Sequence, residues 1–283
     1  MTGARSESVT EHQRLIDAHF NAQPHFWKDL YEENSLYGTI HRERSAIALR
    51  WVADLALPAA ARILEVGCGA GLLAVDLARR GYVVEAVDTS PAMVDLARGH
   101  AAAAGVTDRL TVRLGDAHAL PAKTGSSRLV IALGVVPFLH SPAAALREMA
   151  RVLKPDGYVL LTSDNRWRLN HVLDPWLTLV LAPAKQVARR LGGQLGGRLP
   201  VQRYSYTALE RLMSTAELSI LRCMTLGFGP FSLCRRPLFP ETVAIGVHRR
   251  LQRLADRGTP VLHATGAQHI VLARPAASDH ASH

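Results

Sequence analysis

Three glycines at alternate positions, Gly67, Gly69 and Gly71, follow a short apolar run and precede a segment of helical periodicity. Because glycine has no Cβ atom, the backbone of such a loop can lie close against a ligand. A glycine loop between a buried strand and a helix is typical of nucleotide-binding sites in α/β proteins. The spacing therefore predicts that the chemistry of this chain involves a nucleotide-like ligand.

Three acidic residues are placed to contact the same ligand. Glu65 stands two residues before the first glycine, Asp88 ends the second apolar run, and Asp116 ends the third. A carboxylate at Asp88 can accept hydrogen bonds from two ribose hydroxyls, and one at Asp116 from an exocyclic adenine amine. Glu65 is poorly placed beside a pyrophosphate but well placed beside a cation.

The residue after the last glycine separates two ligands. The dinucleotide fingerprint is G-x-G-x-x-G/A, and its sixth position is occupied here by Leu72. An adenosine that carries a positive group and no phosphate fits the glycines and the three acids better. S-adenosylmethionine (SAM) is such a ligand, and an NAD-binding oxidoreductase is the alternative from a different class.

These side chains converge only if strands and helices alternate along the chain. Apolar runs predict strands over residues 62–66, 82–88, 109–116, 127–134, 158–163, 218–226 and 268–275. Helical periodicity predicts helices over residues 11–20, 42–57, 72–81, 92–104, 143–153 and 207–217, and one within 235–256. Ser90, Ser141 and Thr207 are expected as N-caps, and residues 154–157 as a turn. The order predicts an α/β fold with a doubly wound, seven-stranded, mostly parallel sheet, whose strand ends meet at the site.

Five segments in order resemble the motifs of the class I SAM-dependent methyltransferases, of the small-molecule type found in quinone biosynthesis. They are "ILEVGCGAGLLAVDLARRG", "VEAVDTSPAMVDLAR", "GDAHALP", "RLVIALGVVPFL" and "EMARVLKPDGYVLLT". The resemblance covers roughly residues 43–165 and implies a Rossmann-like methyltransferase fold with helical lid insertions. Within one domain overall, it implies an N-terminal helical lid (1–57), a SAM-binding core (58–165), a helical insertion serving as substrate lid (166–205), and the rest of the core with a second insertion (206–283).

The resemblance also implies roles for individual residues toward SAM. The expected cofactor-binding residues are Arg44, Glu65, Gly67, Cys68, Gly69, Gly71, Asp88, Thr89, Met93, Asp116, Ala117, Leu133 and Gly134. Arg44 is expected at the methionine carboxylate, Glu65 at its ammonium group, and Asp88 at the ribose. Asp116 and Ala117 are expected to flank the adenine.

The catalytic base is left open by a departure from the family. Many small-molecule members read "EH" after the fourth strand, where this chain has Pro137 and Phe138. Methyl transfer from a sulfonium needs a base only if the nucleophile carries a proton of high pKa. His140 and His171 follow the fourth and fifth strands and are the candidate bases. No metal is expected in the site.

The least family-like segments are expected to bind the methyl acceptor. Aromatic residues in and near the insertions form the expected substrate lid: Tyr37, Trp167, Trp176, Phe228 and Phe231. Their apolar character predicts a bulky hydrophobic small molecule, such as a natural product or a quinone, methylated on oxygen. Alternatives are methylation of carbon or nitrogen, methylation of a lipid at the membrane surface, or a non-catalytic SAM-binding protein.

Composition sets the remaining expectations. The formal charge is +9, without a run of consecutive basic residues or an aromatic-basic recognition module, so nucleic acid is not the expected partner. Residues 176–191 place an apolar stretch beside three cations, which allows a peripheral membrane contact. Three cysteines without a C-x-x-C pair, and no apolar signal or spanning segment, predict a cytoplasmic protein.

Overall fold

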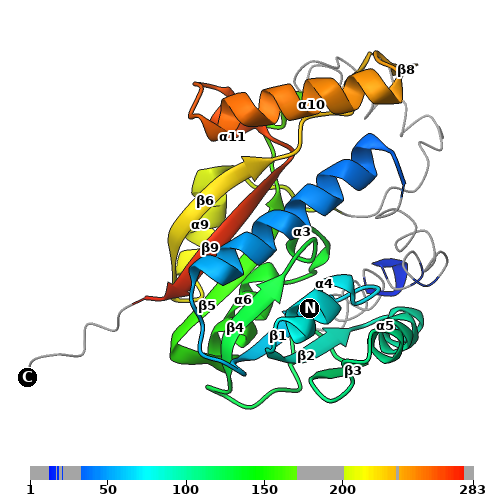
Figure 1. Ribbon diagram of the computed structural model, residues 1–283. Coiled ribbons are helices and arrows are strands. Elements are labelled where there is room, and N and C mark those ends of the chain that lie inside the picture. Colours follow the sequence, from blue (N-terminus) through cyan, green and yellow to red (C-terminus); the bar gives the residue numbers. More distant parts are fainter. Residues whose placement is uncertain are drawn as a thin grey trace, which may run out of the picture.

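The computed structural model describes residues 13–16, 18, 21, 33–170, 201–233 and 236–276. Its centre is a seven-stranded sheet in the order β3-β2-β1-β4-β5-β9-β6 (Figure 1). The strands are β1 (Arg62–Val66), β2 (Val83–Asp88), β3 (Leu110–Leu114), β4 (Ser127–Ala132), β5 (Leu153–Asp164), β6 (Leu218–Leu226) and β9 (Gln268–Pro275). Strands β1 to β5 pair in parallel, and β9 runs antiparallel to both β5 and β6. The doubly wound, mostly parallel sheet predicted from the sequence is thus confirmed.

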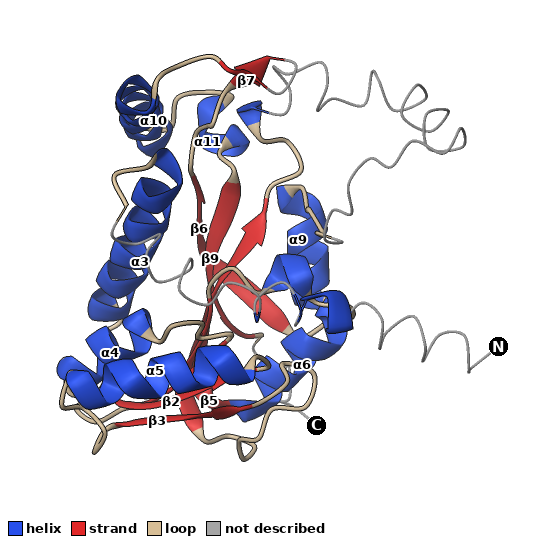
Figure 2. Cartoon of the chain, turned by 90° about the vertical axis from the view of Figure 1, so that its right-hand side faces the viewer, coloured by secondary structure: helices blue, strands red, loops and turns tan. Residues whose placement is uncertain are grey.

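Helices cover both faces of this sheet (Figure 2). Helices α3 (Leu36–Asp54), α4 (Leu72–Arg79) and α5 (Pro91–Ala103) enclose one hydrophobic cluster, and α6 (Pro142–Val152) and α9 (Tyr206–Ser214) enclose the other. Successive strand residues alternate between the two clusters, with Ile63 in the first and Leu64 in the second. This period of two explains why the central strands read as continuous apolar runs, because both of their faces are buried.

Three local expectations are corrected by the structure. Helix α3 begins at Leu36, well before residue 42, because the Ser35 hydroxyl accepts a hydrogen bond from the Gly38 N–H at 3.0 Å. Helix α9 is capped by Ser205 instead of Thr207, with its hydroxyl 3.3 Å from the Ala208 nitrogen. The expected turn at residues 154–157 lies inside β5, where an irregular register lets Leu153 pair with Ser127.

The second insertion forms a hairpin and two helices. Strands β7 (Ser232–Leu233) and β8 (Arg236–Pro237) pair with each other, and α10 (Glu241–Asp256) and α11 (Leu262–Thr265) follow. Helices α10 and α3 contact each other in parallel, since the Leu36 N–H donates to the Glu241 carboxylate and Glu43 bonds to His248 two turns further on. None of the described helices is long and apolar enough to cross a membrane. The expected first lid falls largely on residues 171–200, which lie outside the described residues.

Candidate active site

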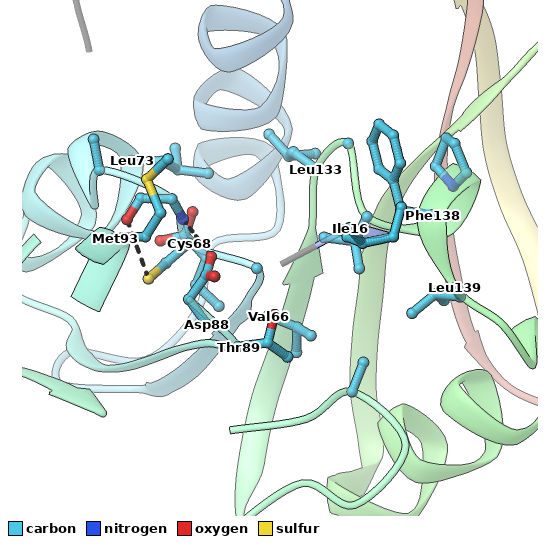
Figure 3. A pocket seen from close by; sticks show the side chains of 18 of the residues that line it. Ile16, Val66, Cys68, Leu73, Asp88, Thr89, Met93, Leu133, Phe138 and Leu139 are labelled. Atoms are coloured by element: carbon cyan, nitrogen blue, oxygen red, sulfur yellow. Dashed lines mark hydrogen bonds between the residues drawn. The ribbon is translucent and has the colours of Figure 1, made fainter. Parts of the chain in front are cut away.

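A pocket of about 370 Å³ lies where the parallel strands end. It receives residues from α3, from the loops after β1, β2, β3 and β4, and from the ends of β5 and β9. Figure 3 shows Cys68, Asp88, Thr89 and Met93 gathered on one side of this pocket and Ile16, Phe138 and Leu139 on the other. The pocket therefore has a polar, glycine-rich part and a more apolar part.

The glycine loop has the backbone that only glycine adopts readily. Gly67, Gly69 and Gly71 have φ values of 66°, 52° and 74°. Gly67 and Gly69 line the pocket, and a Cβ atom at Gly67 would lie 2.4 Å from Cγ2 of Val135. Gly71 is not among the lining residues, and a Cβ atom there would lie 2.7 Å from the Cβ of Ala97 in α5. Gly71 therefore allows α4 and α5 to pack closely, and the structure does not place it against the pocket.

Asp88 ties the glycine loop to the next helix. Its Oδ2 accepts a hydrogen bond from the Gly69 N–H at 2.9 Å, and its Oδ1 accepts one from the Ser90 N–H at 2.9 Å. The Ser90 hydroxyl in turn accepts from the Met93 N–H at 3.2 Å, as expected for the N-cap of α5. Each carboxylate oxygen has a second lone pair, so Asp88 can hold the loop and accept from a ligand at once.

Glu65 is a buried carboxyl group beside a second acid. Burial, and then the nearby charge of Asp88, raises the pKa of Glu65 to about 8, against a hydrogen bond from the backbone of Ala74 that lowers it. Within the described part of the chain, its Oε2 has no hydrogen-bond partner. Since Glu65 lines the pocket, a cation placed there would both pair with this oxygen and restore its charge. The donor set therefore fits the ammonium end of an amino-acid-bearing ligand.

Asp116 is oriented by a histidine that the sequence did not single out. Its Oδ1 accepts hydrogen bonds from the His118 N–H at 2.9 Å and from His118 Nδ1 at 2.7 Å. The other ring nitrogen of His118, Nε2, accepts from the Ser141 N–H at 3.3 Å, so the ring is held between Ser141 and Asp116. These bonds lower the pKa of Asp116, the largest contribution coming from the His118 side chain. Asp116 and Ala117 both line the pocket, as expected.

The candidate base His140 lies behind the pocket wall. Its ring stacks on that of His118, with ring centroids 3.6 Å apart, and His140 is not among the lining residues. The chain turns through the short 3-10 helix η1 (Val136–Phe138) before reaching it, so Phe138 and Leu139 face the pocket instead. The other candidate base, His171, lies outside the described residues.

Helix α3 contributes a cationic and aromatic wall. Tyr37, His41 and Arg44 stand at helical spacing on one face of this helix and line the pocket. A Cβ atom at Gly134 would lie 3.1 Å from the Arg44 guanidinium, so the glycine leaves room for this side chain. Burial, and then the charge of Arg44, lowers the pKa of His41 to about 3, against a hydrogen bond to the carbonyl of Tyr37 that raises it.

The expected lid residues fall in different places. Tyr37 lines the pocket, whereas Trp167 is exposed and not among the lining residues. Phe228 and Phe231 pack with Ala255 in a separate hydrophobic cluster under α10, so they do not face the pocket. Trp176 lies outside the described residues. The pocket thus includes most of the residues expected to bind the methyl donor, SAM, but few of those expected to bind the methyl acceptor.

Several lining residues were not anticipated from the sequence. They are Gln13, Ile16, His41, His118, Asp164, Arg203 and Gln268. Asp164 joins two strand ends, because its Oδ2 lies 2.6 Å from Arg168 Nη2 and its Oδ1 accepts from Gln268 Nε2 at 3.2 Å. Asp164 directly follows the fifth expected strand, and this position at a strand end is the signal in the sequence that could have predicted it as a site residue.

Solved structures with the same architecture identify the fold as the Rossmann-like methyltransferase fold. Magnesium protoporphyrin IX methyltransferase from Synechocystis PCC 6803, solved with S-adenosylhomocysteine, aligns with a TM-score of 0.60 at 19% identity, over 93% of this chain and all of that one. A 4+2 cyclase, SpnF, aligns with a TM-score of 0.52 at 20% identity, over 79% of this chain and 77% of that one. The second match shows that this fold by itself does not fix the reaction.

Sequence comparison relates the core to known proteins. Residues 64–161 match the profile of a family described as a methyltransferase domain, so the resemblance is confirmed over this range. A ubiquinone biosynthesis O-methyltransferase from Xanthomonas axonopodis pv. citri is 36% identical over 121 residues, which are 42% of this chain and 50% of that protein. The chain thus matches about half the length of this curated relative.

Proposed function

We propose that the protein is a SAM-dependent methyltransferase. The observation that carries the proposal is the pocket itself, where Glu65, Asp88 and Asp116 face a glycine loop at the ends of three adjacent parallel strands. The carboxylates of Asp88 and Asp116, and the Glu65 carboxyl that would ionise beside a cation, disfavour a pyrophosphate and favour a neutral or cationic adenosine. The methyltransferase domain over residues 64–161 supports the same cofactor.

The residues of the polar part would hold SAM by its distinct groups. We expect Glu65 to accept from the ammonium group, Arg44 to pair with the carboxylate, and Asp88 to accept from the ribose hydroxyls. Asp116 and Ala117 would contact the adenine. The other expected lining residues, Gly67, Cys68, Gly69, Thr89, Met93, Leu133 and Gly134, would shape the wall around the sulfonium and the ribose.

Bound SAM would supply an electrophilic methyl group to a nucleophile in line with its sulfur. The protein's task is then to align the acceptor, exclude water and receive the acceptor's proton. His140 is removed from the pocket by its position behind His118, so we do not propose it as the base. His41 lines the pocket, but burial and Arg44 lower its pKa to about 3, so it is too weak a base for this step. The expectation for His171 stands as a proposal.

The acceptor is proposed to be a bulky hydrophobic small molecule methylated on oxygen. The part of the pocket away from the glycine loop is lined by Ile16, Tyr37, Phe138, Leu139 and Val201, which favour an apolar or aromatic ring system. A curated relative named for O-methylation in ubiquinone biosynthesis supports a quinone-like acceptor. Transfer to carbon or nitrogen, or to a lipid, would use the same donor site.

Calorimetry tests whether the pocket binds a SAM-type ligand or a nicotinamide dinucleotide. We expect S-adenosylhomocysteine to bind the purified chain and NADH not to bind. Replacing Asp88 by Ala should weaken the first interaction by about tenfold or more, because the ribose loses a charged acceptor. Binding of NADH in place of S-adenosylhomocysteine would instead identify an oxidoreductase.

Turnover assays then test the acceptor and the base. With labelled SAM, apolar catechols and hydroquinones should be methylated faster than small polar acceptors at equal concentration. His171→Gln should lower kcat, whereas His140→Gln should not. Binding of SAM without turnover on any acceptor would favour a non-catalytic SAM-binding protein, and a preference for polar acceptors would contradict the proposed substrate class.

A further inference from the structure

A short stretch of the second insertion exposes a group of large apolar side chains. Leu233, Leu238, Phe239 and Val243 are 50%, 52%, 38% and 47% exposed. Leu233 ends β7, Leu238 and Phe239 follow β8, and Val243 is in the first turn of α10, so the four lie within eleven residues of the chain. Single exposed apolar residues are ordinary, but such a grouping is typical of an interaction surface.

The outer face of α10 continues this surface with positive charge. Val243, Gly246, Arg250, Arg253 and Arg257 follow one another at helical spacing, and all five are exposed. Their spacing places the three arginines on one stripe that contains no acidic residue. The surface therefore changes from apolar at the hairpin to cationic along the helix.

The opposite face of α10 packs against the rest of the protein through hydrogen bonds of His248 and Gln252. His248 accepts from the Phe228 N–H through Nδ1 at 3.1 Å and bonds to Glu43 through Nε2 at 2.8 Å. Gln252 accepts a hydrogen bond from the Gly227 N–H at 3.0 Å. It also donates one to the carboxylate of Asp256, the acidic residue at the end of the helix. The helix is thereby fixed with its arginine stripe directed away from the core.

No described element covers this outer side. Figures 1 and 2 both show α10 along one edge of the molecule, with the hairpin at its beginning and α3 beneath it. The same α3 carries Tyr37, His41 and Arg44 of the pocket. A partner bound to this side would thus be separated from the pocket wall by one helix.

We propose that Leu233, Leu238, Phe239 and Val243, together with the arginine stripe of α10, form a docking surface for an anionic lipid bilayer. The apolar side chains would enter the headgroup region, and Arg250, Arg253 and Arg257 would pair with lipid phosphates. The whole chain carries a formal charge of +9, so its net charge as well as the arginine stripe would attract an anionic bilayer. This surface is distinct from residues 176–191, and the proposal does not depend on the methyltransferase activity.

Vesicle co-sedimentation of the full chain tests this surface. We expect binding to vesicles of phosphatidylcholine with about one third phosphatidylserine, weaker binding to phosphatidylcholine alone, and release by salt. Exchanging all three stripe arginines for glutamate should lower partitioning to the anionic vesicles by at least about tenfold. Replacing Leu238 and Phe239 by Ser should weaken binding while leaving the charge unchanged.

A second triple variant controls for net charge. Arg62→Glu, Arg79→Glu and Arg274→Glu make the same change in charge at exposed positions on other elements, so this variant should keep most of the binding. Circular dichroism and thermal unfolding of each variant check that the fold is intact. An equal loss in both triple variants would overturn the proposal in favour of unspecific charge attraction, and a wild-type chain that stays in the supernatant would also overturn it.

Discussion

The glycines of residues 67–71 share a left-handed backbone but differ in their surroundings. Gly69 has no atom within 4 Å of an added Cβ, whereas at Gly71 the Cβ of Ala97 would lie 2.7 Å away. Alanine in this conformation costs about 1–2 kcal/mol of backbone strain at either position. At Gly71 the contact between α4 and α5 adds a further cost of about 1–3 kcal/mol.

Gly71→Ala is therefore expected to be the less stable variant, and Gly69→Ala the one with the weaker ligand affinity. The first loses helix packing, and the second places a methyl group in the pocket. Urea unfolding and calorimetry with S-adenosylhomocysteine measure the two effects separately. Gly99→Ala is the control, because this exposed glycine of α5 has open space around it and alanine favours a helix. Equal stability of the Gly69 and Gly71 variants would refute the packing role.

Glu65 predicts that ligand binding releases a proton. With a pKa raised to about 8 by burial and by Asp88, its carboxyl is mostly protonated at pH 7 in the unliganded protein. A ligand ammonium group beside it would favour the ionised form, so binding should release up to about one proton and strengthen from pH 6 to pH 8. Calorimetry in buffers of different ionisation enthalpy measures this release. Glu65→Gln should abolish it, and an unchanged release in that variant would assign the proton to another group.

At the scale of elements, the buried His248 is one of the links between α10 and α3. His248→Leu leaves the buried Phe228 N–H without its acceptor and Glu43 without its donor. The free energy of unfolding is expected to fall by about 2–4 kcal/mol. The adjacent Arg249→Ala removes an exposed side chain and should change it by less than about 0.5 kcal/mol. Urea unfolding of both variants decides, and similar values would mean that the histidine does not join the two helices.

Sequence patterns predict those elements whose partners are close along the chain. Strands β1 to β4 and helices α4 to α6 were predicted within a few residues, because apolar runs and amphipathic segments alternate there. The beginning of α3 was missed although its N-cap, Ser35, is local; the first turn also depends on Glu241, which is 205 residues away in sequence. The inward packing of Phe228 and Phe231 was missed because it depends on the distant α10. Local periodicity contains no information on such contacts.

At the scale of the whole molecule, one part of the site could be predicted from the sequence and the other part could not. Its donor half follows from strand ends that are adjacent in a parallel sheet, so the order of motifs was sufficient to bring Glu65, Asp88 and Asp116 together. Its remaining wall combines α3 with residues as distant as Gln268, where no motif gives the register. His118 was missed because its role arises from a contact with Ser141, which only the folded chain provides.

The same buried groups determine how the stability of the whole molecule depends on pH. The pKa of Glu65 rises on folding from 4.5 to about 8, so the folded state holds a proton that the unfolded chain has lost, and stability decreases as pH rises through this range. Burial lowers the pKa of His41 to about 3 and that of His269 to about 4 from 6.5. The unfolded chain therefore binds two more protons below pH 6.5, and stability decreases as pH falls.

Below pH 6.5, the two protons that the unfolded chain gains at His41 and His269 outnumber the one that the folded state holds at Glu65. Above pH 6.5, only the Glu65 proton changes the stability. These three groups together predict maximal stability near pH 6.5, with a change of about 1.4 kcal/mol per pH unit on each side. Urea unfolding at pH 5, 6.5 and 8 measures this profile. Glu65→Gln should remove the alkaline decrease and steepen the acid one to about 2.8 kcal/mol per pH unit, because both histidines then act unopposed. His269→Leu should nearly cancel the decrease between pH 6.5 and 4.5 and leave the alkaline one. If both variants kept the wild-type profile, the pH dependence would have to come from other groups, and the buried charges of the pocket would not control it.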